Sequence, residues 1–260
     1  MFTAMMTAAS GLNKQQQRMD TIAHNISNVN TIGFRNSRLD FKSALYTAGL
    51  TPGPPRTPAP EGNQQRGHGV MTAAISRDFS QGSVQETGAP LDLAIFGDGF
   101  FAVENMFGDI VYTRNGNFGF DDEGYLVTAN GYLVLNSADE RITLPFGANP
   151  ERVGVLSDGT MTFMVGDDEI RISLGTHTFR NIMGLEALGD GFYGETEASG
   201  ERLPVADDFE VIQGFLELSN VNLGLEMTRL IRTQRAFQLA SRALSTADDM
   251  EGLANNMRRG

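Results

Sequence analysis

Apolar side chains recur at alternating steps of four and three residues near both ends of the chain, over residues 5–26 and 223–244. This spacing is typical of the a and d positions of helices that pack against other helices. We therefore predict long helices over residues 3–28 and 219–255, with stripes that need partners. The stripe residues expected to form an assembly interface are Met5, Leu12, Met19, Ile26, Leu223, Met227, Leu230, Phe237 and Leu244.

Between the helices, short apolar runs alternate with turn sequences from Val70 to about Gly214. Asn-Gly and Asp-Gly favour tight hairpins, because both central positions of the turn need positive φ. The expected turns are Asn115-Gly116, Glu123-Gly124, Asn130-Gly131 and Asp158-Gly159. The apolar runs are Leu91–Ile95, Phe100–Val103, Ile110–Thr113, Tyr125–Val127, Tyr132–Leu135, Met161–Val165 and Ile170–Leu174.

These patterns predict an α+β fold: long N- and C-terminal helices packing in coiled-coil fashion around a central antiparallel, partly barrel-like β domain. Residues 49–69 hold five of the nine prolines and five glycines, so this segment cannot be a helix or a central strand. We expect a terminal helical assembly domain of residues 1–34 and 215–260. An extended Pro/Gly-rich linker over 35–70 and a central β domain over 71–214 complete the division.

Charge is unevenly distributed along the chain. Residues 71–215 carry seven basic and 24 acidic side chains, whereas the whole chain has a net charge of −12. The acidic charge therefore belongs to the middle domain, and the helical ends are nearly neutral and able to pack closely. A nucleic acid partner is disfavoured because the middle domain has no basic stripe.

Composition removes several other classes of protein. The chain has no cysteine, which excludes disulfides, thiolate metal sites and cysteine nucleophiles. No apolar run approaches the roughly 18 residues of a membrane span. The N-terminus lacks a basic region followed by a compact apolar core, so we expect no cleavable signal peptide and no membrane insertion.

Chemistry-bearing motifs are weak. The run Gly97–Ala102 formally fits a dinucleotide-binding pattern, but that pattern needs a following helix, and another β run comes next. We interpret it as a tight turn whose aromatic residues are core. The histidines, at 24, 68 and 177, are far apart, and the acidic clusters at 121–123 and 167–169 lack the spacing of an EF-hand. We predict no metal, no cofactor and no catalytic residue.

Some alternatives stay open on these residues alone. Two carboxylates for glycoside hydrolysis depend on a spatial separation that sequence does not reveal. The face of Arg229, Arg232, Arg235 and Arg242 could pair across an interface or be solvated. The apolar stripes could serve a helix pair within one chain. The choice lies between a structural filament subunit and a soluble β-domain binding protein or hydrolase with a terminal helix hairpin.

Several stretches resemble the flagellar axial proteins of bacteria, the rod and hook family. The similar runs are Gly11–Phe34 near the start, Leu93–Phe101 and Tyr112–Thr128 in the middle, and Ser219–Phe237 near the end. They cover both ends and the centre of the chain. The family-motif residues are Asn25, Asn28, Gly33, Phe34, Gly97, Gly99, Phe100, Ser219, Asn220, Gln234 and Arg235.

The resemblance implies a structural subunit and not an enzyme. Length and the insert after the first helix look most like the distal rod members, then the proximal rod members of similar build. Such a subunit is exported without cleavage through the flagellar type III apparatus. It polymerises helically into the basal-body shaft that transmits torque across the periplasm to the hook. The implied partners are copies of itself, other rod proteins, the hook and the surrounding ring proteins.

Overall fold

The computed structural model describes residues 2–43, 46–48, 65–67, 70–166, 168–205 and 209–257. The chain forms two compact units. The helical unit contains residues 1–26, 37–76 and 223–260, and the β unit contains residues 27–36 and 77–222. Most of the Pro-rich segment 49–69, together with His68 and Asp167, lies outside the described residues.

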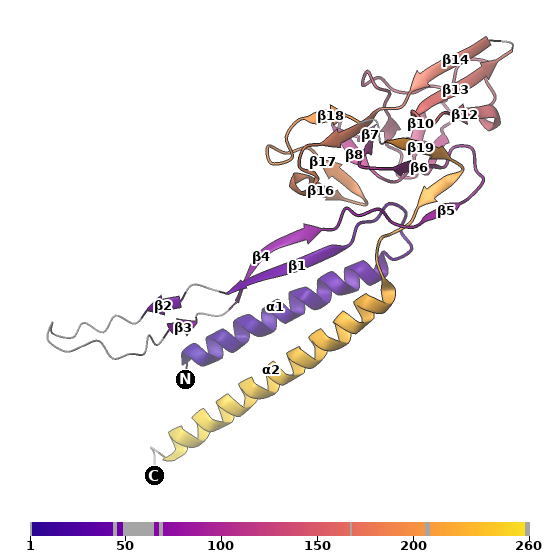
Figure 1. The fold of residues 1–260 in the computed structure, drawn as a ribbon. Coiled ribbons are helices and arrows are strands. Elements are labelled where there is room, and N and C mark those ends of the chain that lie inside the picture. The colour runs from indigo at the N-terminus through magenta and orange to yellow at the C-terminus, as the bar shows by residue number, and fades with distance from the viewer. Residues whose placement is uncertain are drawn as a thin grey trace. The chain divides into compact units, whose positions relative to one another are not determined.

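Both predicted terminal helices are present. The helical unit holds α1 (Phe2–Ser27) and α2 (Leu223–Met257), together with the paired strands β1 (Ser37–Ser43) and β4 (Val70–Arg77). A short antiparallel pair, β2 (Tyr46–Ala48) and β3 (Gln65–Gly67), completes it. Figure 1 shows α1 lying between the β1–β4 pair and α2. No helix in the described part of the chain is long and apolar enough to cross a membrane.

The helix boundaries have local causes. α1 ends at Ser27 and is followed by a turn and then by Gly33, whose φ of +67° favours glycine. α2 begins at Leu223, not at Ser219 or Asn220 as the capping pattern predicts. The reason is that the Asn220 side chain binds backbone groups of other segments and is not free to cap a helix.

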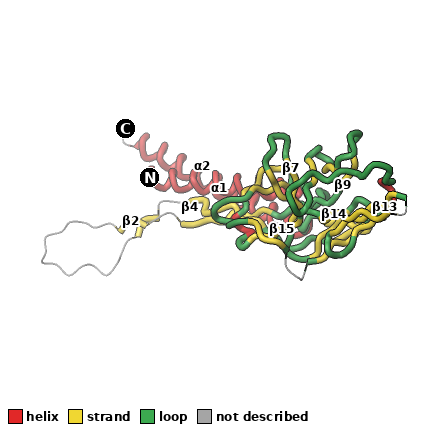
Figure 2. The backbone as a smooth tube through the Cα atoms, turned by 90° about the horizontal axis from the view of Figure 1, so that it is seen from above, coloured by secondary structure: helices red, strands yellow, loops and turns green. Residues whose placement is uncertain are grey.

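In its described residues the β unit consists of strands and loops, with short helical turns at Pro150–Arg152 and Ile182–Gly184 (Figure 2). Every predicted apolar run coincides with a strand, although bounds differ by one or two residues. The strands are β5 (Val84–Glu86), β6 (Leu93–Phe96), β7 (Phe100–Glu104), β8 (Ile110–Thr113), β9 (Phe118–Phe120), β10 (Leu126–Thr128), β11 (Leu133–Val134), β12 (Val153–Val155), β13 (Thr160–Val165), β14 (Asp168–Ser173), β15 (Thr176–Phe179), β16 (Glu186–Gly189), β17 (Phe192–Gly194), β18 (Arg202–Pro204), β19 (Glu210–Gln213) and β20 (Phe215–Glu217).

The largest sheet has the order β16-β17-β8-β7-β11-β10-β9, with β15 pairing both β7 and β18. Smaller sheets join β12, β13 and β14, then β6 with β19, and β5 with β20. All these pairings are antiparallel, and over the described residues they do not close into a barrel. The α+β class is therefore confirmed.

Three of the four predicted turns join paired strands. Gly124, Gly131 and Gly159 all have positive φ and lie between β9 and β10, β10 and β11, and β12 and β13. The prediction for Asn115-Gly116 was wrong, because β8 pairs with β7 and β17 whereas β9 pairs with β10. The space at Gly116, and not a hairpin, requires glycine. A Cβ there would lie 1.8 Å from the carbonyl oxygen of Leu93.

Strand β7 separates two hydrophobic cores. Phe100 and Phe101 point to opposite faces of the strand, as alternation requires, and both are fully buried. Phe101 belongs to the larger core with Leu93 and Phe163, and Phe100 to a smaller aromatic core with Tyr193. The central strand is therefore covered on both faces.

Candidate functional site

Helix α2 has a covered face and, on the opposite side, exposed apolar residues. One face is covered within the helical unit, and its residues recur at steps of four and three, the spacing of a helix-packing seam. On the other side Met227, Ile231 and Leu253 are 49%, 51% and 64% exposed in the described part of the chain. The covered residues are Glu226, Leu230, Thr233, Phe237, Ala240, Leu244 and Ala247.

The predicted interface residues divide between these environments. Leu223 and Met227 are exposed on α2. Met5 lies in α1, but its side chain is outside the described part of the structure. Their contacts with another copy stay a prediction. The half-buried members are Leu12, Met19, Ile26, Leu230, Phe237 and Leu244.

Asn25 ties α1 to two neighbours inside the helical unit. Its side-chain amide donates to the Ser37 carbonyl (2.8 Å) and accepts from the Ser37 N–H (3.0 Å), as a neighbouring strand would do. It also lies 3.5 Å from a carboxylate oxygen of Glu226, which in turn binds Arg229. This motif residue therefore links the end of α1 to β1 and to the first turns of α2.

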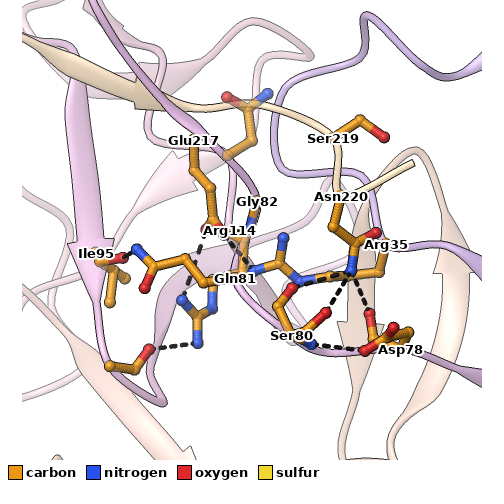
Figure 3. A network of polar contacts seen from close by, with 12 residues as sticks. Arg35, Asp78, Ser80, Gln81, Gly82, Ile95, Arg114, Glu217, Ser219 and Asn220 are labelled. Carbon is orange, nitrogen blue, oxygen red and sulfur yellow. Dashed lines mark hydrogen bonds and ion pairs between the residues drawn. The ribbon is translucent and has the colours of Figure 1, made fainter. Parts of the chain in front are cut away.

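The chain passes between the two units at four points. The segments next to three of these points meet in one polar cluster of the β unit (Figure 3). We call this cluster the polar junction. It consists of Gly33–Asn36, Asp78–Gly82, Arg114 and Glu217–Asn220.

Glu217, at the end of β20, is the ionic centre of the polar junction. One carboxylate oxygen accepts from Nη2 of Arg35 (2.8 Å) and from the backbone N–H of Gly82 (2.8 Å). The other lies 3.6 Å from Nη1 of Arg114. The Glu217 backbone carbonyl accepts from the N–H of Gly33 at 2.8 Å. A single residue thus connects four parts of the chain.

Asn220 is the second centre of the polar junction. Its Oδ1 accepts from the backbone N–H of Asn36 at 2.7 Å. Its Nδ2 donates to the carbonyls of Asp78 (2.8 Å) and Ser80 (2.9 Å). One amide side chain therefore joins the Ser219–Asn220 segment to two others, which also bond to each other through the Asp78 N–H and the Asn36 carbonyl (2.9 Å).

The polar junction buries more positive than negative charge. Arg35, Arg114 and Glu217 are 1%, 3% and 0% exposed. Burial lowers the pKa of Arg114 to about 10, although the Glu217 carboxylate opposes this, so the side chain stays cationic at neutral pH. Nη2 of Arg114 donates to the Gly97 carbonyl (2.7 Å), and its guanidinium lies 5.1 Å from the Phe100 ring centre, where a cation–π attraction stabilises it.

Two glycines allow the segments of the polar junction to approach. At Gly33, a Cβ would lie 2.8 Å from the backbone nitrogen of Asn115. At Gly82, a Cβ would lie 2.0 Å from the carbonyl oxygen of Leu218. The backbones are therefore in direct contact at both points, and side chains are excluded there.

Many predicted motif residues converge on this cluster, and two central residues were missed. Gly33, Phe34, Ser219 and Asn220 lie in it, and Gly97 and Phe100 contact Arg114. Sequence reasoning did not single out Arg35 or Glu217. A charge inside the apolar run Phe215–Leu218 is a signal that could have revealed Glu217. The remaining members lie elsewhere: Asn28 accepts from Thr31 at the end of α1, Gly99 lies against Phe209, and Gln234 and Arg235 are exposed on α2.

The motifs that could have indicated an enzyme do not form such a site in the described part of the structure. No helix follows Gly97–Gly99, since β7 begins at Phe100, so the nucleotide-binding interpretation fails. Asp121 orders a turn by accepting from the N–H groups of Glu123 and Tyr125. Within the described ranges, no group of three His, Asp or Glu side chains could hold a metal ion.

His177 lies elsewhere in the β unit, beside Tyr112 and near the charges of Arg202 and Asp139. Its ring centre is 6.0 Å from that of Tyr112, and the Arg202 guanidinium binds the Asp139 carboxylate. Burial lowers the pKa of His177, with Arg202 adding to the effect and Asp139 opposing it. Burial also raises the pKa of Tyr112. The arrangement keeps the imidazole neutral near pH 7.

Three family models match the chain in order. The flagella basal body rod protein model matches residues 5–35, and the flagellar hook protein FlgE/F/G D1 domain model matches residues 94–163. The flagellar basal body rod FlgEFG protein C-terminal model matches residues 212–257.

Full-length relatives agree with these matches. The flagellar basal-body rod protein FlgG of Borreliella burgdorferi is 39% identical over 269 residues, covering 100% of both chains. The chain belongs to the flagellar basal-body rod protein family. FlgG of Agrobacterium fabrum is 36% identical over 97% of this chain and 98% of the relative. A FlgF protein of Mesorhizobium japonicum is 32% identical over 90% and 89%.

Family membership decides between the open alternatives. The relatives are named flagellar basal-body rod proteins, so the hydrolase alternative falls away and the chain is a structural rod protein of FlgG type. The two FlgG relatives are more similar to the chain than the FlgF relative, at 39% and 36% identity against 32%.

Proposed function

We propose that this chain polymerises helically into the distal part of the flagellar basal-body rod, a hollow shaft that transmits motor torque to the hook. The observation that carries this is the open apolar face of α2, in a chain whose relatives are rod proteins. A stable monomer has no use for such a face, whereas an open helical assembly needs one patch that fits a different patch on the next copy.

The terminal segments 1–34 and 215–260 would act as the assembly domain. In this proposal, α1 and α2 pack in coiled-coil fashion in the assembled shaft. The nine predicted interface residues would lie against other helices there, and the segment 35–70 would serve as a spacer to neighbouring subunits. Support comes from the four-and-three spacing of both apolar stripes.

The acidic β domain, residues 71–214, would face outward. Its excess of negative charge keeps the shaft surface hydrated and disfavours adhesion between shafts. The partners would be copies of the same chain, other rod proteins, the hook and the surrounding ring proteins. The shaft would cross the periplasm, and the subunit would be exported without cleavage of a signal peptide.

Substitution on the open face of α2 tests this function. Ile231→Glu places a charge on the face that should contact the next copy, so we expect cells that make no rod beyond the proximal part and do not swim. Because Ile231 is half-exposed in the single chain, the purified variant should keep the helical content and melting temperature of the wild type. Electron microscopy of basal bodies and circular dichroism provide the two measurements.

Met183→Glu is the matched control, since Met183 is an exposed apolar residue of the β unit. It should assemble and swim normally. Normal rods in Ile231→Glu would show that the open face of α2 is not an assembly surface.

A further inference from the structure

We propose that the open face of α2 packs against the exposed face of α1 of a second copy, in one antiparallel register. The occupant of the open face is then a second copy of this chain. The inference deepens the proposed function and rests on it, because an open helical assembly needs two different patches that fit each other, and the exposed face of α1 supplies the second.

The first step is the exposed face of α1. Six of its residues recur at steps of four and three, and each of them is exposed. Only Asp20 among them is charged, whereas a helix face that meets only water normally carries many charges. Depletion of charge is typical of the centre of an interface. The residues of this α1 seam are Ala9, Asn13, Gln16, Asp20, Ala23 and Ser27.

The second step is a matching row of residues on the open face of α2. It begins about one turn after Ile231 and follows the same steps of four and three, and all its residues are exposed. The order of the steps is the same in both directions, so the row can align with the α1 seam in antiparallel orientation. The residues of this α2 seam are Arg235, Leu239, Arg242, Thr246, Asp249 and Leu253.

The third step is the direction of the helices. Within the helical unit α1 and α2 run in opposite directions (Figure 1), and the Asn25 amide near the end of α1 lies 3.5 Å from a carboxylate oxygen of Glu226 in the first turn of α2. A helical assembly gives every copy the same direction along its axis. Where the α1 of one copy meets the α2 of another, the two helices are therefore antiparallel as well.

The fourth step is the fit of the apolar side chains. Leu239 and Leu253 are 66% and 64% exposed, and they are two heptads apart. Ala9 and Ala23 on the α1 seam are also two heptads apart. One antiparallel register therefore sets Ala23 opposite Leu239 and Ala9 opposite Leu253, and a small residue opposite a large one lets packed layers interdigitate.

The fifth step is charge, which selects the same register. It sets Asp20 opposite Arg242, and Asp249 opposite the neutral amide of Asn13. A shift of one heptad in one direction would set Asp20 against Asp249, and like charges disfavour that pairing. The opposite shift would set Leu239 against the polar side chain of Gln16. Exposed ion pairs add little affinity, so the pairing of Asp20 with Arg242 acts mainly on register.

Disulfide cross-linking in assembled rods tests the register. The chain has no cysteine, so Ala23→Cys with Leu239→Cys introduces the only two thiols. Each copy would then be linked to the next, and we expect a ladder of covalent multimers from oxidised basal bodies on a non-reducing gel. A bond within one chain would give no ladder.

The matched control is Ala23→Cys with Thr246→Cys, which moves one thiol by one heptad, about 10 Å along the helix and too far for a disulfide. It should give no ladder, and neither should either single cysteine of the first pair. A ladder from this offset pair, or no ladder from the first pair in rods that assemble, would overturn the register.

Exchange of charges tests the occupant without cysteines. Asp20→Arg and Arg242→Asp should each abolish rod assembly and swimming, and the two together should restore both. Both positions are exposed, so the purified variants should keep the wild-type melting temperature. Asp20→Arg with Arg232→Asp is the control, because Arg232 is an exposed base of α2 outside the seam, and this pair should not restore swimming.

These outcomes are separable from those for the proposed function. If Ile231→Glu blocks assembly but the exchanged pair restores nothing, the open face of α2 binds another surface, such as an acidic β unit, and only the pairing with α1 fails. If Ile231→Glu assembles normally, the open face of α2 is not an assembly surface and both proposals fail.

Discussion

Phe100 and Phe101 are adjacent in β7, yet their side chains lie in different cores of the β unit. Phe100 packs edge-on against Tyr193 and Phe179 and also supports Arg114 of the polar junction. Phe101 packs edge-on against Phe118 in the larger core. Both positions therefore support the β unit, and Phe100 has the additional task of stabilising a buried cation.

Truncation of either phenylalanine should be costly. We expect Phe100→Ala and Phe101→Ala each to lower the free energy of unfolding by about 3–5 kcal/mol, the usual range for a buried aromatic residue. Phe107→Ala is the control, because Phe107 is 90% exposed at the tip of the β7–β8 hairpin and should change stability little. Urea unfolding followed by circular dichroism measures all three. Equal losses at positions 100 and 107 would contradict the two-core description.

His177 should make the stability of the β unit depend on pH. Burial, aided by Arg202 and opposed by Asp139, lowers its pKa below the ordinary value of 6.5, so the unfolded chain binds the proton more readily than the folded one. The contribution of His177 to stability is thus complete above pH 6.5 and is lost as the pH falls through the folded pKa.

The matching measurement compares melting temperatures from about pH 7.5 to about pH 5. The wild type should lose more stability over this range than His177→Gln, which has no imidazole to titrate. Parallel curves for the wild type and His177→Gln would show that the imidazole does not carry this dependence.

At the scale of single residues, sequence patterns revealed local constraints and missed spatial ones. Gly33 was predicted as part of the turn that ends α1, and its positive φ agrees with that. The partnership of Arg35 with Glu217 joins residues 182 positions apart, and no spacing rule connects them. The charges could be noticed in the sequence, but their pairing could not.

At the scale of elements, the hydrophobic periodicity predicted secondary structure best where burial in a core was the main constraint on the segment. The seven apolar runs became strands because alternate side chains in each enter a core. The start of α2 was placed too early, because Ser219 and Asn220 have the side chains of helix caps but are used in the polar junction. Tertiary bonding overrode the local preference for capping.

Gly116 offers a prediction at this scale. Its neighbour in space is the Leu93 backbone, so Gly116→Ala should push the segment between β8 and β9 away from β6 and lower the free energy of unfolding by more than about 1 kcal/mol. Gly119→Ala, in β9, has no atom within 4 Å of its new Cβ and should be nearly neutral. Thermal unfolding of the two variants tests whether the close backbone approach at Gly116, and not the loss of a glycine as such, causes the destabilisation.

At the scale of the whole molecule, the sequence suggested terminal helices around a β domain. In the structure, each compact unit is built from segments that are not consecutive in the chain. The β unit includes residues 27–36 together with residues 77–222, and β1 and β4 belong to the helical unit. Such a division depends on contacts between distant segments, which a pass along the sequence cannot see. The acidic character of the middle region was, by contrast, readable from composition alone.

Two truncations show where the β unit ends. A chain of residues 1–222 loses α2 but retains Glu217 and Asn220, so we expect the β unit to unfold cooperatively with near wild-type stability. A chain of residues 1–214 ends at the predicted domain boundary and removes β20, which pairs with β5, together with both centres of the polar junction. It leaves Arg35 and Arg114 buried without a counter-ion, and breaking a buried pair in this way costs about 3–5 kcal/mol.

Near-ultraviolet circular dichroism and limited proteolysis should therefore report a folded β unit in the first truncation and a loosened one in the second. Equal protease resistance of the two would mean that the β unit is complete at residue 214, and that residues 215–222 serve the helices alone.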